Sequence, residues 1–148
     1  MTAANTLKIG DFSLAKQFEK WSKDCSNTKG VGNTFFKAPE MFFGQGVSTS
    51  VDIWALGIVL LHMIFVHPPF MELDEAQYMM QICLQRKTPD VPDFVDSDVQ
   101  ALLQACLNFE AENRPSANDL QKITAKLRPG KLFCLILITV SFHSRMNL

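Results

Sequence analysis

The sequence predicts a mainly α-helical fold with a buried core, and three observations support this prediction. The 148 residues are 47% apolar and 20% charged, and a chain of this length can bury roughly two thirds of its unfolded surface. After residue 50, apolar residues recur at helical spacing, and three of the four patterns begin beside Ser or Thr. Only residues 7–12 alternate between apolar and polar residues as a half-buried strand does. Length and pattern together indicate about one domain.

Charge and cysteine content exclude several classes of protein. The chain has 14 basic and 15 acidic residues, which excludes a strongly basic nucleic-acid binder, a disordered tail and a collagen-like repeat. No Cys-x-x-Cys pair occurs, and no His stands at metal-ligand spacing from a cysteine. The first six residues lack the basic and apolar regions of a secretory signal. We therefore expect a cytoplasmic protein with reduced thiols and no nucleic-acid partner.

The N-terminal third is predicted to contain one strand and one long loop. Residues 7–12, Leu-Lys-Ile-Gly-Asp-Phe, suit a short strand. Residues 16–34 are rich in Lys, Ser, Thr and Asn, with Gly30 and Gly32 near the end, which indicates a loop. Loops of this length in compact domains are usually functional or disordered.

Residues 51–66 are predicted to form a central buried helix. They are apolar at 13 of 16 positions, and a helix that is apolar on all sides belongs in a core or in a bilayer. The run is shorter than the ~20 residues that span a membrane. Thr49 and Asp52 have the spacing of a capping box at its start, and Pro68 and Pro69 end it.

Three amphipathic helices are predicted to follow. The first covers residues 72–86, the second is capped by Ser97, and the third opens with Ser116 and Asp119 three residues later. The apolar face of the first consists of Leu73, Ala76, Met80 and Cys83. That of the second consists of Val99, Leu102, Leu103, Cys106 and Leu107. That of the third consists of Leu120, Ile123 and Leu127.

The last segment differs in character from the rest. Residues 132–142 form a run of eleven mostly apolar residues, too short for a transmembrane helix. The run is typical of a strand or of an exposed, aggregation-prone tail. We expect no membrane anchor.

Four motifs occur in order along the chain. Residues 8–15 are Lys-Ile-Gly-Asp-Phe-Ser-Leu-Ala, and residues 32–40 are Gly-Asn-Thr-Phe-Phe-Lys-Ala-Pro-Glu. Residues 52–57 are Asp-Ile-Trp-Ala-Leu-Gly, and residues 113–116 are Asn-Arg-Pro-Ser. They resemble the K-I-x-D-F-G-L-A, G-T-x-x-Y-x-A-P-E, D-x-W-x-x-G and late Arg-Pro-Ser/Thr motifs of the C-terminal lobe of eukaryotic protein kinases. Four motifs at this spacing make a chance match very rare.

The resemblance implies a domain map and a subfamily. Residues 1–6 are an N-terminal remnant, and residues 7–128 are a partial kinase C-terminal lobe whose activation segment is 11–40. Residues 129–148 form an apolar C-terminal extension without a family counterpart, an unrelated addition or a read-through of non-coding sequence. The kinase fold is α+β, and its N-terminal lobe is absent here. The stretches 89–94 and 106–116 look most like Ser/Thr kinases of the MAP-kinase-cascade type.

The resemblance also assigns roles to individual residues. Asp11 matches the aspartate that holds Mg²⁺ on the ATP phosphates, and Asp52 matches one that braces the catalytic loop, although capping its helix is a sufficient role by itself. Glu40 and Arg114 match a buried structural ion pair. The substrate-binding loop matches Gly32, Asn33, Thr34 and Phe36. Candidate phosphorylation sites in the activation loop are Ser22, Ser26 and Thr28.

Three positions depart from the family pattern. Ser13 replaces a glycine, which restricts the backbone changes available there. Asn33 stands where Ser/Thr kinases usually have Thr, and Phe36 where they usually have Tyr. Thr34 can take the place of the missing threonine if the match to the family motif is shifted by one residue.

The family transfers phosphate from ATP with Mg²⁺ to protein serine or threonine. The sequence holds no Gly-rich loop, no strand lysine and no H-R-D motif, all of which the reaction requires. A single Mg²⁺ ligand does not position ATP, so we expect no activity from this chain alone. Without a catalytic loop, we also expect apolar side chains near Trp54 and Leu56 to be exposed.

The alternative is a non-catalytic, pseudokinase-like interaction module. It would bind kinase-cascade partners or protein substrates through a groove formed by residues 32–50 and the helix at 72–86. The pattern gives no oligomeric state.

Overall fold

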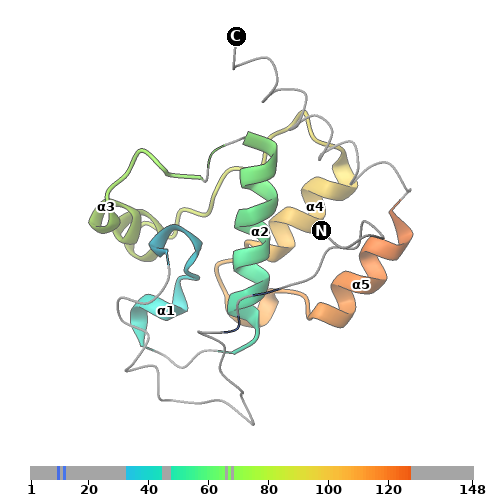
Figure 1. Cartoon of the computed structure of the whole chain (residues 1–148), viewed down its shortest axis with the longest axis horizontal. Helices are drawn as coiled ribbons and strands as arrows, with labels where there is room; N and C mark the ends of the chain where they lie inside the picture. The colour runs from blue at the N-terminus through green and yellow to red at the C-terminus, as the bar shows by residue number, and fades with distance from the viewer. Residues whose placement is uncertain are drawn as a thin grey trace.

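The computed structural model describes residues 10, 12, 33–44, 48–65, 67 and 69–127 (Figure 1). In these residues every regular element is helical and none is a strand. The elements are η1 (Thr34–Phe36), α1 (Glu40–Phe43), α2 (Ser50–Phe65), α3 (Glu75–Met79), the π-helical turn η2 (Met80–Leu84), α4 (Ser97–Cys106), η3 (Ala111–Asn113) and α5 (Ala117–Lys126). The mainly α-helical prediction is confirmed. Of the predicted strand 7–12 only residues 10 and 12 are described, and neither is in a strand; most of the long loop and the apolar tail lie outside the described residues.

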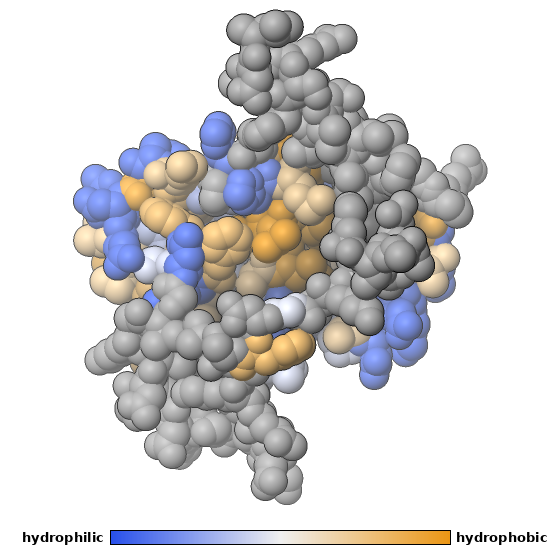
Figure 2. All heavy atoms as spheres, viewed as in Figure 1, coloured by the Kyte–Doolittle hydropathy of each residue, from blue (hydrophilic) through white to orange (hydrophobic). Residues whose placement is uncertain are grey.

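Helix α2 is the centre of the arrangement, with α1 and α3 on one side and α4 and α5 on the other (Figure 1). Its buried residues are Ile53, Trp54, Gly57, Ile58 and Leu61. As expected for apolar side chains near Trp54 and Leu56, Leu56 and Val59 are each more than 40% exposed, as is Phe65, although Trp54 itself is fully buried. Figure 2 shows apolar atoms over this helix near the middle of the face in view. The prediction of a helix buried on all sides is therefore wrong for one side.

Two apolar clusters meet at α2. The larger one joins Trp54, Ile58 and Leu61 to α3, η2 and α4, and the smaller one joins Ile53 to α4 and α5. Helices α2 and α4 approach closely at Gly57, where an added Cβ would lie 2.9 Å from the Leu107 side chain. A larger residue at this position would have to displace Leu107.

Residues 72–86 differ most from the prediction. The helix begins only after Asp74, whose side chain and that of Gln77 form a capping box, and it passes into the π turn at Met80. The buried residues are Tyr78, Ile82 and Cys83, whereas Ala76 and Met80 are exposed. The predicted face was wrong at Ala76 and Met80 and right at Cys83, because apolar residues occur on every side of this segment and periodicity alone does not select one.

The last two helices agree better with the sequence. The whole predicted face of α4 is buried, although its N-cap is Asp96 rather than Ser97, with Asp98 N donating to Asp96 at 3.0 Å. The capping box of Ser116 and Asp119 opens α5 as predicted. No described helix is long and apolar enough to cross a membrane.

Candidate functional site

The motif residues with the best-defined geometry lie in residues 33–40, which run through η1 into α1. Asn33 caps η1, because its side-chain oxygen accepts a hydrogen bond from Phe35 N at 3.1 Å. The turn closes with a backbone hydrogen bond from Lys37 N to Thr34 O at 3.1 Å. Asparagine is among the best cap residues because its short side chain reaches these free backbone donors. The segment therefore has a defined local conformation before any tertiary contact is considered.

Thr34 fastens this segment to α3. Its side chain is buried, and its hydroxyl donates a hydrogen bond to Glu75 Oε1 at 2.8 Å. Glu75 is the first residue of α3 and lies 41 residues further along the chain. Hydrogen bonds to a carboxylate are stronger than those between neutral groups. The contact therefore positions the turn relative to a distant helix.

Tyr78 contacts the same segment through both its hydroxyl and its ring. Its hydroxyl is within hydrogen-bond distance of two backbone oxygens, Phe35 O at 3.2 Å and Lys37 O at 3.4 Å, and its single proton is shared between these two acceptors. Its ring contacts Phe35 edge-on at 5.3 Å between centroids, with Phe42 and Phe70 at 6.1 Å. Burial raises the pKa of Tyr78 far above its usual value. The hydroxyl therefore stays protonated and remains a donor.

Glu40 and Arg114 form a two-pronged ion pair at the other end of the segment. Arg114 Nη1 lies 2.7 Å from Glu40 Oε1, and Nη2 lies 2.8 Å from Oε2. The Arg114 side chain is 0% exposed, and the Glu40 side chain is 13% exposed. The structure thus brings together the two residues that the family resemblance pairs.

The remaining donors of Arg114 are also satisfied. They bind the backbone oxygens of Asn108 at 2.7 Å, Ser50 at 3.1 Å and Phe109 at 3.0 Å, and the guanidinium lies 5.0 Å from the Trp54 ring centre. A buried charge is tolerated only with such complete pairing. One side chain therefore holds α1, the start of α2 and the loop after α4 together.

The Cys106 thiol near this pair is unreactive. Burial raises the pKa of Cys106 to about 11, and the positive charge of Arg114 offsets only part of that increase. A protonated, buried thiol is a poor nucleophile and a poor metal ligand. We assign Cys106 a packing role.

The other predicted site residues are less well placed. Asp52 is exposed in the first turn of α2, where its negative charge interacts favourably with the helix dipole. Phe36 is half-buried against the core. The others, Asp11, Gly32, Ser22, Ser26 and Thr28, lie outside the described residues. Within the described part of the chain, which does not include Asp11, no group of three or more His, Cys, Asp or Glu residues could hold a metal ion.

Sequence reasoning missed the two residues that hold η1. The sequence pattern places Glu75 and Tyr78 within the helix predicted at 72–86 and gives neither a specific role. The one available signal was that Tyr78 is the only tyrosine of the chain, in a pattern otherwise rich in methionine. Its partners are backbone oxygens, which no side-chain pattern reveals.

Comparison with known proteins identifies the family. The protein kinase domain family matches residues 1–124. The serine/threonine-protein kinase pakB of Dictyostelium discoideum is 34% identical over 120 residues, which cover 78% of this chain and 13% of that protein. MAP kinase kinase kinase mkh1 of Schizosaccharomyces pombe is 32% identical over 119 residues, 76% of this chain and 11% of that protein. Mitogen-activated protein kinase kinase kinase 3 of Arabidopsis thaliana is 30% identical over 115 residues, 77% of this chain and 18% of that protein.

The chain thus spans less than a fifth of the length of these relatives. The matched region contains η1, α1, the central helix and the Glu40–Arg114 pair. The chain belongs to the protein kinase domain family.

Proposed function

We propose that this chain supplies the substrate-facing part of a protein serine/threonine kinase of the MAP-kinase-cascade type. The single observation that carries the proposal is the fixed geometry of residues 33–40. These residues are held by Thr34 on Glu75 at one end and by Glu40 on Arg114 at the other. In the family, the matching segment receives the protein substrate next to the phosphate acceptor. The substrates would be proteins of a kinase cascade.

ATP and Mg²⁺ belong to this proposal as cofactors of the complete reaction. When bound, they supply the phosphoryl group and the charge that neutralises it. The residues here would hold the segment in place and, through Asp11, contribute one oxygen ligand. We propose that the 148 residues taken alone transfer no phosphate, because they contain no Gly-rich loop, strand lysine or H-R-D motif.

The test is a phosphate-transfer assay on the purified 148-residue chain. The chain is incubated with radiolabelled ATP, Mg²⁺ and a general substrate such as myelin basic protein. We expect no incorporation above the no-enzyme background in wild type, in Asp11→Ala or in the matched control Asp24→Ala. Incorporation that disappears in Asp11→Ala and persists in Asp24→Ala would show that the chain alone is active.

The activation loop adds a second element to the proposal. Ser22, Ser26 and Thr28 would receive phosphate from another kinase, because an added phosphate can order such a loop through Lys or Arg contacts. Mass spectrometry after treatment with an upstream kinase would locate the phosphate. Modification elsewhere in the chain, with these three residues unmodified, would contradict this element.

A second candidate function is a non-catalytic module that binds kinase-cascade proteins. The observation in its favour is that Met71, Met79 and Leu84, all within the short segment 71–84, are exposed. Exposed apolar surface of this kind, where it is contiguous, often marks a site of protein binding. Fluorescence anisotropy with a labelled MAP kinase kinase would test it, with Leu84→Asp expected to abolish binding and Ile123→Asp on α5 as the control. Equal binding by both variants would contradict this function.

A further inference from the structure

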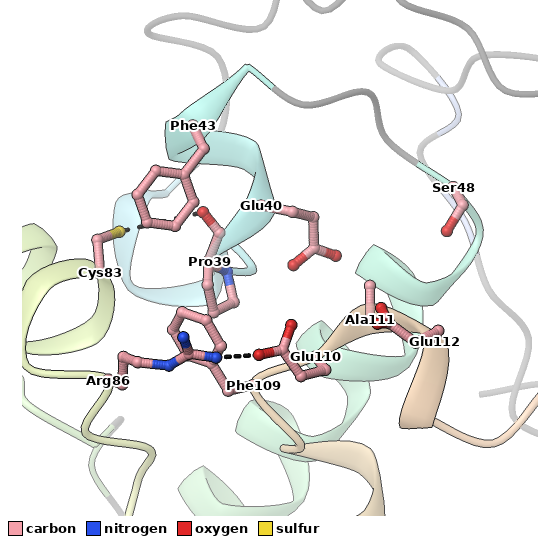
Figure 3. Close-up of a pocket in the computed structure, with 10 residues that line it drawn as sticks. All are labelled: Pro39, Glu40, Phe43, Ser48, Cys83, Arg86, Phe109, Glu110, Ala111 and Glu112. Atoms are coloured by element: carbon pink, nitrogen blue, oxygen red, sulfur yellow. Dashed lines mark hydrogen bonds and ion pairs between the residues drawn. The ribbon is translucent and has the colours of Figure 1, made fainter.

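A cavity of about 310 Å³ lies between α1, the end of η2 and residues 109–112 (Figure 3). Its apolar wall is formed by Pro39, Phe43, Cys83 and Phe109. The volume is at the lower end of the range for ligand pockets. It therefore suits one side chain or a similarly small group better than a nucleotide.

Three carboxylates also line this cavity, against a single cation. They are Glu40, Glu110 and Glu112, and the cation is Arg86. Glu40 is fully occupied by Arg114, whereas the described residues provide no ion-pair partner for Glu112. In Figure 3 the carboxylates of Glu40 and Glu110 face one another across the cavity. The electrostatic balance favours a cationic occupant.

Arg86 already shows how the cavity recognises a cation. Its guanidinium lies 4.1 Å from the centre of the Phe109 ring and forms an ion pair with Glu110. An aromatic face with a carboxylate at its edge is a typical setting for a guanidinium, which can stack and pair at the same time. The two partners are 58% and 46% exposed, so the pair is screened by water and easily exchanged.

The backbone of Arg86 supplies an independent observation. Its φ of 52° lies in the left-handed region, at the end of a helical turn where glycine is the usual residue. A non-glycine residue held there carries strain, and such strain is often found at functional positions. The chain therefore places a strained arginine over this cavity where a glycine would fit with less strain.

We propose that this cavity binds the side chain of an arginine on a partner protein, and that Arg86 occupies its mouth when no partner is present. The incoming methylene groups would lie against Phe43 and Pro39, and the guanidinium would meet Glu110 and Glu112. Phe43 lines the cavity and is partly exposed, so a residue next to the arginine would find an apolar contact. Lysine would bind more weakly, because it has no planar group to stack on Phe109. The proposal is independent of phosphate transfer.

The test is an NMR titration of the full chain with Nα-acetyl-arginine amide. The matched probes are the lysine amide and the citrulline amide, which is neutral and nearly the same shape as arginine. We expect saturable shifts of the backbone amides of residues 109–112 with arginine, weaker ones with lysine and none with citrulline. Equal shifts with arginine and citrulline would overturn the proposal.

Three conservative variants separate recognition from structure. Glu110→Gln should weaken arginine binding about tenfold, because the neutral amide can still accept a hydrogen bond but no longer carries the charge that strengthens it. Arg86→Gln should strengthen binding about threefold, since it removes the internal competitor. Glu72→Gln, an exposed change that does not line the cavity, should leave affinity unchanged.

Near-ultraviolet circular dichroism establishes that each variant is folded. Unchanged or weaker binding in folded Arg86→Gln would show that Arg86 is a structural residue rather than a stand-in for the ligand, and would overturn that part of the proposal. Loss of binding in Glu72→Gln equal to that in Glu110→Gln would indicate an unspecific charge effect and would overturn the site.

Discussion

Two arginine–glutamate pairs border the same cavity, and they differ in almost every physical respect. Arg114 and Glu40 are 74 residues apart in sequence, nearly inaccessible to water, and joined by two hydrogen bonds of normal length. Arg86 and Glu110 are 24 residues apart and about half exposed. The first arginine also binds three backbone oxygens, whereas the second stacks on one ring. The same two residue types therefore serve as a structural link in one place and as an exchangeable contact in the other.

The largest effect is expected from the buried pair. Arg114→Ala leaves the Glu40 carboxylate and three backbone oxygens without their partner, and breaking such a pair costs about 3–5 kcal/mol. Urea unfolding followed by circular dichroism measures the change in the free energy of unfolding. The matched control is Arg86→Ala, the same substitution at the exposed pair. A loss for Arg114→Ala no greater than that for the control would contradict the distinction between the two pairs.

A smaller effect is expected at the opposite end of the segment. Tyr78→Phe removes the hydroxyl that binds Phe35 O and Lys37 O and leaves the ring in place. Because buried acceptors lose their donor, we expect a loss of about 1–2 kcal/mol. The same urea experiment measures it, with Phe42→Leu as a control that changes packing and no hydrogen bond. If Tyr78→Phe has no effect, the Tyr78 hydroxyl does not hold the segment, and only its ring contributes.

Alkaline pH should lower the stability of the folded chain through the buried Cys106 thiol near Arg114. The pKa of Cys106 is raised to about 11 in the folded chain, so the unfolded chain loses this proton at a lower pH. Stability from this group is therefore fully present below its unfolded pKa of 9.0 and is lost as the pH rises toward 11. Thermal melts between pH 8 and pH 11 should show a fall in Tm that is shallower in Cys106→Ala. Parallel curves for the two proteins would remove the thiol from the explanation.

Sequence reasoning succeeded where local signals suffice. The start of α5 was predictable from the capping box at Ser116, and the buried face of α4 from its regular spacing, although Ile123 of the face predicted for α5 is exposed. The segment around Tyr78 was not predictable, since apolar residues surround it and only tertiary contacts select the buried side. The pairing of Glu40 with Arg114 came from the family resemblance, because no spacing rule links residues 74 apart. The cavity at Arg86 lies between residues 32–50 and 72–86, the two segments expected to form a groove, whereas the part played by residues 109–112 was not predicted, because no local pattern shows that this distant segment joins them.

The smallest effect on stability is expected from Arg86→Gly. This change removes an exposed ion pair, worth about 0–1 kcal/mol, and also relieves the left-handed backbone of a non-glycine residue, worth roughly 1–2 kcal/mol. Glycine in turn increases the conformational freedom of the unfolded chain. The contributions oppose one another, so we expect a net change within about 1 kcal/mol.

Arg86→Ala separates these contributions, because alanine loses the ion pair and keeps the strain. We therefore expect urea unfolding to show Arg86→Gly as more stable than Arg86→Ala. The order would be reversed if the exposed pair, rather than the backbone, determined the stability of this turn. In that case Arg86 would resemble Arg114 as a structural link, and the contrast between the two arginine–glutamate pairs would be one of degree only.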